Sequence, residues 1–416
     1  MAAFLQIDSL DIAFLTGRSM AILLRMMILP EGDPMPVETF RFHIADEVIA
    51  DTLDRVRRAR WPRRLGDGGW GFGVSHDFMR RFVDYWTSDY DWRRTEAELN
   101  HWPQFRADID DCKIHFYHVR GEGAASRPLL LTHGWPGSVL EFLPMIDRLT
   151  HPSRHGGSAQ DAFTVVVPSA PGFAASIFPD GKPMGPVRTA EMWRTLMVDI
   201  LGYDRFGVQG GDFGAIVNVQ MAARFPEHIA AMHLNLFPVT MAPDDRLSAE
   251  EAAYVEQCAA FSAREFGYMN LHGIKPNTVA FALADNPLGT AAWILEKFHA
   301  WSDHGGDILE AFTLEQLCAN VSLYAFTDTI DSSIRFYEGF HRELGGAYCP
   351  ADRIAVPTAM AIFPRELLPA RPPRSWADRH YDIRRWTPMP RGGHFAAMEE
   401  PELLTTDIQA FFRDYL

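Results

Sequence analysis

The sequence predicts an α/β protein whose mostly parallel, doubly wound sheet carries an inserted helical cap and an N-terminal helical extension. Three observations predict this fold. Short, continuously apolar runs at residues 128–132, 163–168 and 206–208 are typical of strands buried on both faces, and helical stretches separate them. This alternation of strand and helix stops between residues 247 and 343, where apolar residues recur at helical spacing. It returns with the strand-like apolar run at 354–362. Regular succession of strand and helix implies right-handed parallel crossovers.

The segment before this alternation has two parts. Residues 1–37 are expected to be a tail, because charged residues interrupt their apolar stretches at Asp8, Asp11, Arg18 and Arg25. No uncharged run there reaches the roughly 18 residues of a spanning helix, so stable membrane insertion is not expected. Membrane association through residues 1–35 and an alternative start site are the other interpretations of this segment. The start of the chain also lacks the pattern of a secretory signal.

Residues 38–112 are expected to form an N-terminal helical domain. Apolar residues recur there at helical spacing, and Asp46 and Asp77 are the expected N-caps. Strand character begins at Lys113. The expected core is therefore split into residues 113–240 and 349–416, and residues 241–348 form the cap between its halves.

Net charge and cysteine content argue against nucleic-acid binding, a zinc site and a disulfide framework. A net charge of -15 argues against nucleic acid as the main partner. The four cysteines form no CxxC pair, which predicts neither a zinc site nor a disulfide framework and favours the cytoplasm; they are Cys112, Cys258, Cys318 and Cys349. We expect no metal and no organic cofactor.

The most informative motif follows the apolar run at 206–208. Residues Gly210-Gly211-Asp212-Phe213-Gly214 have the pattern of a strained strand-to-helix turn that lifts one side chain out of the sheet, with aspartate where serine usually stands. A carboxylate in that position can attack a saturated carbon and form an alkyl ester that water must then cleave. A glycine-rich turn with an Asp cap is the alternative interpretation.

Other segments that follow strands supply candidate partners, because ligands bind outside the carboxyl ends of parallel strands. His394 lies between glycines and an expected C-terminal helix, after Asp212 in chain order, as a catalytic base would. Its expected acid partner is Glu366, just past the strand ending at Ile362. Three other carboxylates compete for this role, namely Asp352, Asp378 and Asp382. The alternative interpretation is that His394 is a solvated loop residue and that Glu366 lies on the surface without a catalytic role.

An early loop, residues 133–138, can point backbone N–H groups at a developing oxyanion, although a plain turn explains its glycines and proline equally well. Phe213 would supply a second N–H. Aromatic residues near the expected mouth favour an apolar pocket, for which we expect His133, Pro136, Phe237 and Trp301 as lining residues.

Taken together, these motifs resemble epoxide hydrolases of the microsomal and juvenile-hormone type, over about residues 38–416. The shared motifs are HGWPGSVLEFLP, GGDFG, GYMNLHGIKPNTV, ILEKFHAW, SSIRFYE, VPTAMAIFPRELLP and RGGHFAAMEEPE. The resemblance implies an α/β-hydrolase fold with Asp212 as nucleophile, His394 as base and Glu366 as its acid partner. It also implies that Tyr268 and Tyr337 donate protons to the epoxide oxygen, and that Trp135 and Phe213 provide the oxyanion N–H groups.

The resemblance implies a small apolar epoxide and water as reactants, and a homodimer is compatible with it. Two departures stand out: Phe213 occupies a position where many relatives have tryptophan, and the N-terminus lacks a clean membrane anchor. A haloalkane dehalogenase also has an Asp nucleophile, but a tryptophan after it would be expected. A receptor that binds a small apolar ligand on the same fold is the alternative from a different class.

Overall fold

The computed structural model describes residues 37–416 apart from 124–126, 180–183, 239–246, 347, 349–351 and 368–371. The expected tail up to residue 36 and Cys349 therefore lie outside the described residues. No helix within the described ranges is long and apolar enough to span a membrane.

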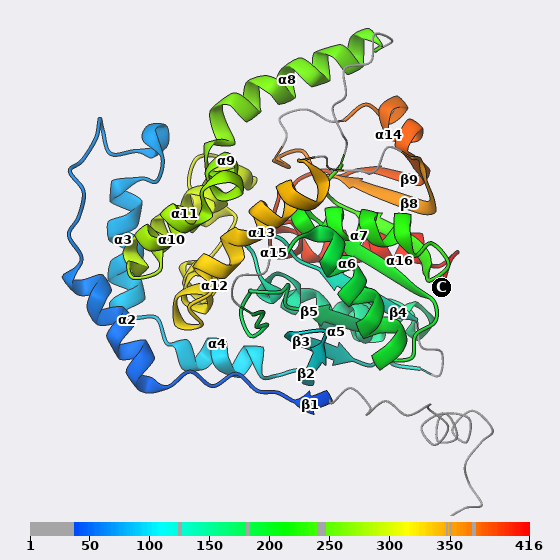
Figure 1. The fold of residues 1–416 in the computed structure, drawn as a ribbon, viewed down its shortest axis with the longest axis horizontal. Helices are drawn as coiled ribbons and strands as arrows, with labels where there is room; N and C mark the ends of the chain where they lie inside the picture. The colour runs from blue at the N-terminus through cyan, green and yellow to red at the C-terminus, as the bar shows by residue number, and fades with distance from the viewer. Residues whose placement is uncertain are drawn as a thin grey trace, which may run out of the picture. The chain divides into compact units, whose positions relative to one another are not determined.

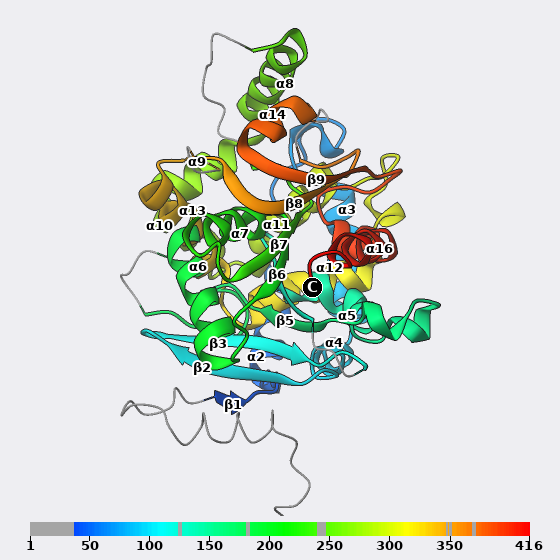
Figure 2. The same ribbon diagram turned by 90° about the vertical axis from the view of Figure 1, so that its right-hand side faces the viewer.

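A single mixed sheet organises the described part of the chain, with nine strands in the order β1-β2-β3-β5-β4-β6-β7-β8-β9 (Figures 1 and 2). The strands are β1 (Val37–Thr39), β2 (Gln104–Ile109), β3 (Cys112–Val119), β4 (Pro128–Thr132), β5 (Thr164–Pro168), β6 (Phe206–Gly210), β7 (Ile229–Leu234), β8 (Ile354–Ile362) and β9 (Tyr381–Pro388). The pairs from β1 to β3, and β3 with β5, are antiparallel. The pairs from β5 through β9 are parallel, which confirms the predicted doubly wound sheet.

Helices cover both faces of this sheet (Figure 2). One face carries α5 (Leu143–Thr150) and α16 (Pro401–Phe412), which pack together, and the other carries α6 (Pro186–Arg194) and α7 (Asp212–Arg224). Alternate residues of β4 enter two different cores, since Leu130 belongs to one apolar cluster and Leu129 and Leu131 belong to the other. Burial on both faces explains why this strand is a continuous apolar run.

In the described part of the segment between β7 and β8, six α-helices form the cap (Figure 1). They are α8 (Ala249–Glu265), α9 (Gly267–Ile274), α10 (Pro276–Leu283), α11 (Pro287–Trp301), α12 (Leu314–Phe326) and α13 (Ile330–Leu344). Helix α13 packs on α9 and α10 and also on α6 of the core, so it joins the cap to the sheet layer. The shorter elements after β8 are α14 (Arg374–His380) and α15 (Ala396–Glu399), and a π-helical turn (Thr195–Ile200) continues α6.

The N-terminal helices pack against the cap. They are α2 (Asp46–Arg58), α3 (His76–Ser88) and α4 (Trp92–Leu99), and each contacts α12 (Figure 1). The indole N–H of Trp86 on α3 donates to Ser322 Oγ on α12 at 2.8 Å, which ties the two segments together in the interior.

Three expectations for this region were wrong. Residues 104–109 form strand β2 rather than helix, because they pair antiparallel with β3 along their whole length. Asp46 and Asp77 lie inside the first turns of α2 and α3 and are not N-caps. The N-cap of α3 is Ser75, whose hydroxyl accepts the N–H of Phe78.

Candidate active site

Asp212 lies at the turn between β6 and α7 and has a left-handed backbone, with φ of 48°. Such a conformation is costly for a residue other than glycine and is found where surrounding structure enforces it. The surroundings are tight: a Cβ on Gly214 would lie 1.9 Å from the carbonyl oxygen of Thr132, and one on Gly134 would lie 2.3 Å from the Asp212 side chain. Only glycine fits at these two positions, so the local sequence allows the strained turn that presents the carboxylate.

The loops after β8 and β9 bring Glu366 and His394 to this carboxylate. His394 Nε2 is 3.2 Å from Asp212 Oδ2, and His394 Nδ1 is hydrogen-bonded to Glu366 Oε1. The two loops are joined because the N–H of Arg365 donates to the carbonyl oxygen of Gly392 at 3.1 Å. The backbone N–H of His394 donates to the carbonyl oxygen of Trp301 at 2.8 Å, which holds the main chain at His394 against the cap.

Electrostatics make His394 a cation in the resting protein. Burial alone would lower its pKa, but the charges of Glu366 and Asp212, and the hydrogen bonds to both, outweigh burial. The pKa of His394 is therefore held well above its ordinary value. Since its side chain is only 3% exposed, the two carboxylates rather than water neutralise this charge.

The competing carboxylates lie elsewhere. Asp378 is on α14, 3.7 Å from Arg374, and Asp382 hydrogen-bonds Arg384 at 2.9 Å near the beginning of β9. Asp352 is exposed just before β8. All three precede or begin a strand, whereas the site is built at the carboxyl ends of strands.

Two backbone N–H groups were expected to form an oxyanion hole. The N–H of Trp135 donates to Asp212 Oδ1 at 2.9 Å. Phe213 is the second residue of α7, where the first four N–H groups of a helix have no partner within it. Both groups thus belong to the backbone immediately around the carboxylate.

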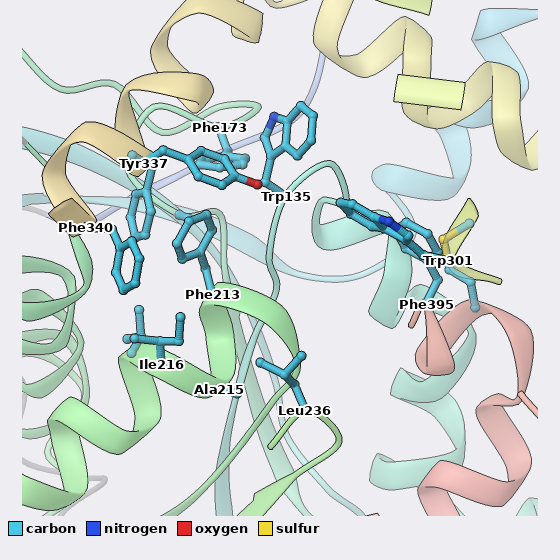
Figure 3. Packing of buried hydrophobic residues seen from close by; sticks show 14 of the residues in the cluster. Trp135, Phe173, Phe213, Ala215, Ile216, Leu236, Trp301, Tyr337, Phe340 and Phe395 are labelled. Carbon is cyan, nitrogen blue, oxygen red and sulfur yellow. The ribbon is translucent and has the colours of Figure 1, made fainter. Parts of the chain in front are cut away.

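The cap places two phenols together above Asp212. Tyr268 on α9 and Tyr337 on α13 have their hydroxyl oxygens 3.5 Å apart. Burial and the charge of Asp212 raise the pKa of Tyr268, and burial, Tyr268 and Asp212 raise that of Tyr337, both well above 10. Figure 3 shows Tyr337 over Phe213 with its hydroxyl directed toward Trp135, whose indole stacks on Tyr268 with ring centroids 5.4 Å apart. Both phenols therefore stay protonated and face the same small space.

An apolar pocket with a volume of about 80 Å³ lies between the cap and Asp212. Its lining includes the two tyrosines and Asp212, and otherwise consists mainly of Phe213, Ile216, Leu236, Phe237, Met269 and Phe340. A pocket with this lining suits a small apolar molecule, with the carboxylate and the phenols as its polar groups.

Of the four expected pocket residues, Phe237 lines this pocket and the other three lie elsewhere. Trp301 is buried against His394, and the centroids of the two rings are 5.1 Å apart. The face of α11 that carries Trp301 is directed toward the base. Pro136 is turned toward α12, where its carbonyl oxygen accepts the amide N–H of Asn320. His133 is held below the site by the N–H of Ala170, which donates to its Nε2 at 3.0 Å.

Sequence reasoning missed the pocket residues contributed by the cap and one buried carboxyl. Met269 adjoins Tyr268 in the GYM motif, and Phe340 lies one helical turn beyond Tyr337, so the tyrosines were the available signal for both. Glu141 lies inside the motif HGWPGSVLEFLP, but nothing in the pattern separates it from a surface residue of a short helix.

Two family models match the chain. Residues 37–142 match the epoxide hydrolase N terminus, and residues 127–251 match the alpha/beta hydrolase fold. Epoxide hydrolase 1 of Oryctolagus cuniculus is 35% identical over 407 residues, which cover 90% of this chain and 88% of that protein. This chain belongs to the epoxide hydrolase family. The fold expectation and the resemblance seen in the sequence are thereby confirmed.

Solved structures of epoxide hydrolases agree with this assignment. The epoxide hydrolase of Aspergillus niger superposes with a TM-score of 0.80 at 30% identity, over 93% of this chain and 98% of that one. The juvenile hormone epoxide hydrolase of Bombyx mori gives a TM-score of 0.82 at 28% identity, over 92% and 95%. Within the described part of this epoxide hydrolase, no group of three or more His, Cys, Asp or Glu side chains is placed to hold a metal ion.

Proposed function

We propose that this epoxide hydrolase converts a small apolar epoxide and water to a vicinal diol through a covalent ester on Asp212. One observation carries the proposal: Asp212 and the hydroxyl groups of Tyr268 and Tyr337 face the same apolar pocket, and a buried imidazole lies 3.2 Å from the carboxylate. An epoxide needs these groups together, namely a nucleophile for carbon and a proton donor for oxygen.

In the first half-reaction an Asp212 oxygen attacks one ring carbon and the carbon–oxygen bond of the ring breaks. The two phenols hydrogen-bond the departing oxygen, and one of them gives it a proton. Because their hydroxyl oxygens are 3.5 Å apart, one epoxide oxygen can lie within reach of both. The product of this step is a glycol monoester of Asp212.

In the second half-reaction His394 takes a proton from water, and the water oxygen attacks the carboxyl carbon of the ester. The N–H groups of Trp135 and Phe213 stabilise the oxyanion, as expected for donors that are fixed before the charge develops. Collapse of the intermediate breaks the bond to the diol oxygen, which takes up this proton from His394. The second water proton then passes from the new Asp212 carboxyl to His394, so the carboxylate and the resting imidazolium are both restored. Glu366 keeps the imidazole oriented and stabilises its cation.

The remaining expectations belong to this proposal. The reaction needs no cofactor, and the boundaries at residues 240/241 and 348/349 separate core and cap. The expected boundary at 112/113 falls inside β3, because β1 and β2 already belong to the sheet. We infer a cytoplasmic location, since Cys112, Cys258 and Cys318 are free thiols. The homodimer stays a prediction that is compatible with the family resemblance.

The source of the first diol oxygen tests the proposal. With enzyme in excess over a small aryl epoxide in ¹⁸O-water, the diol of the first turnover should be unlabelled and the peptide containing Asp212 should carry the label. Labelled diol in the first turnover would contradict the covalent route and reduce Asp212 to a general base. Absence of any diol, with intact ligand bound, would favour the receptor, and halide release from an alkyl halide would favour the dehalogenase.

A further inference from the structure

Asp212 borders a second, smaller cavity on the side away from the apolar pocket. This polar chamber is bordered by Glu141, Asn235, His394 and Asp212. Among the described residues, Asp212 is the only one that lines both the chamber and the apolar pocket. The carboxylate therefore separates a space suited to an apolar substrate from a space suited to a polar one.

The chamber has the size of a water molecule. Its volume is about 10 Å³, close to the roughly 10–15 Å³ that a bound water requires. A buried water also needs two to four polar partners, and the side chains bordering the chamber supply them. An aliphatic or aromatic epoxide does not fit in this space.

The Glu141 carboxyl is built into the chamber. A Cβ on Gly137 would lie 1.4 Å from Glu141 Oε1, so glycine at this position leaves the space that the carboxyl group fills. The neighbours Val139, Leu140 and Phe142 are buried, and Glu141 is half-buried and lines the chamber. Burial raises the pKa of Glu141 to about 8, with the charge of Asp212 acting in the same direction and His394 in the opposite one.

Asn235 completes the polar wall. The amide N–H of Gln209 donates to Asn235 Oδ1 at 2.8 Å, which fixes the orientation of the Asn235 amide. Its NH₂ group then lies over Gly211, where a Cβ would be 2.4 Å from Nδ2. The chamber thus presents a carboxyl acceptor, an amide donor and the imidazole of His394 around one face of Asp212.

Resting on the proposed function, we propose that the polar chamber holds the water that hydrolyses the ester, and that Glu141 is the residue that orients it. The water donates one hydrogen to His394 Nε2 and the other to the Glu141 carboxyl, which turns its oxygen lone pair toward the carboxyl carbon of the Asp212 ester. His394 takes the first proton as the carbon–oxygen bond forms, and it returns this proton to the diol oxygen as the ester bond breaks. The second proton stays on the new carboxyl of Asp212 until it passes to His394, which restores the resting pair of carboxylate and imidazolium. Glu141 gains and loses no proton in the cycle.

This role predicts a division between the two half-reactions. In Glu141→Ala the ester should form at a rate within about 3-fold of wild type and break down about 10²-fold more slowly, the usual loss when a reactant is misplaced by about 1 Å. Both kcat and KM should fall while kcat/KM, which reports ester formation, stays constant. Glu141→Gln keeps an acceptor oxygen of the same size, so its loss in ester breakdown should be smaller. Rapid-quench intact-mass spectrometry measures both rates.

Glu343 is the matched control. Its carboxyl is also half-buried and also lies against a glycine, Gly185, but it accepts the N–H of Val187 at the junction of cap and core. Glu343→Gln should leave ester breakdown unchanged.

Unchanged ester breakdown in both Glu141 variants would overturn the proposal, as would an equal loss in ester formation and breakdown, which would indicate a structural role. If Glu141→Ala does not fold, Glu141→Gln decides alone, since slower breakdown with normal formation supports the role and unchanged breakdown refutes it. Absence of an ester in the wild-type protein and in His394→Gln would instead refute the proposed function.

Discussion

A buried histidine that takes no part in the proposed reaction gives a quantitative test of how this protein responds to acid. His115 on β3 is fully buried, with Nδ1 2.9 Å from Ser169 Oγ and Nε2 2.9 Å from Gln104 Oε1. Burial, reinforced by the charge of Arg106, lowers the pKa of His115 to about 3. The folded protein therefore keeps this imidazole neutral at any pH at which the enzyme would be assayed.

The unfolded chain, in contrast, binds a proton at its ordinary pKa of about 6.5. Below that pH the unfolded state binds more protons than the folded state, so the free energy of unfolding falls as the pH falls from about 6.5 toward 3. Between about pH 7.5 and pH 5 this single group costs about 2 kcal/mol, since the pH then lies about 1.5 units below the unfolded pKa at 1.4 kcal/mol per unit.

Urea unfolding at both pH values, followed by tryptophan fluorescence, measures this loss. His115→Gln should lose about 2 kcal/mol less than wild type between the two conditions, whatever its stability at the higher pH. His101→Gln, which changes an exposed histidine, is the control and should follow wild type. Equal losses in wild type and His115→Gln would refute the description of His115 as a neutral, buried group.

Three further predictions concern catalysis. His394→Gln should form the ester and fail to hydrolyse it, so intact-mass spectrometry should show an adduct of the substrate's mass; an unmodified protein with untouched substrate would remove His394 as the hydrolytic base. Tyr268→Phe and Tyr337→Phe should each slow ester formation less than the double variant, whose rate should fall by roughly 10²- to 10⁴-fold. Rapid-quench experiments measure these rates, and a double variant no slower than the single variants would contradict a shared donor role. Glu366→Gln should slow ester breakdown by up to about 10⁴-fold. Asp378→Asn, which changes an exposed carboxylate that the sequence left as an alternative acid partner, should leave ester breakdown unchanged. If Asp378→Asn were the slower variant in the same assay, the acid partner would have to be reassigned.

The sheet was predictable where burial leaves a compositional signature. Strands β4 and β8 are apolar along almost their whole length because helices cover both faces, and both were expected within a residue or two. Strand β2 alternates polar and apolar residues over only six positions, and β1 is exposed at all three of its residues. Strand β2 pairs with β3, and β1 pairs with β2. The alternation in β2 is the pattern of a half-buried strand, whereas the three exposed residues of β1 carry no pattern that specifies their partner.

The site was predictable for a different reason. Asp212 and His394 stand beside glycines that their backbone geometry requires, so the sequence carries a mark of the turn as well as of the chemistry. Trp301 has no such mark: the sequence places it on a cap helix, but only the packing of that helix decides that its ring faces His394 and not the pocket. The same holds for Glu141, whose position depends on a contact with Gly137 across a turn.

The charges around Asp212 explain how one imidazole can be a cation at rest and a base one step later. In the free protein two carboxylates hold the pKa of His394 well above its ordinary value, so it begins the cycle protonated. Ester formation removes the charge of one of them, so the pKa of His394 must fall at the moment when a base is needed. The same event leaves a phenolate at Tyr268 or Tyr337, which needs a proton. The proton released by His394 can restore the phenol, so the first half-reaction itself prepares the base for the second without a change in the net charge of the site.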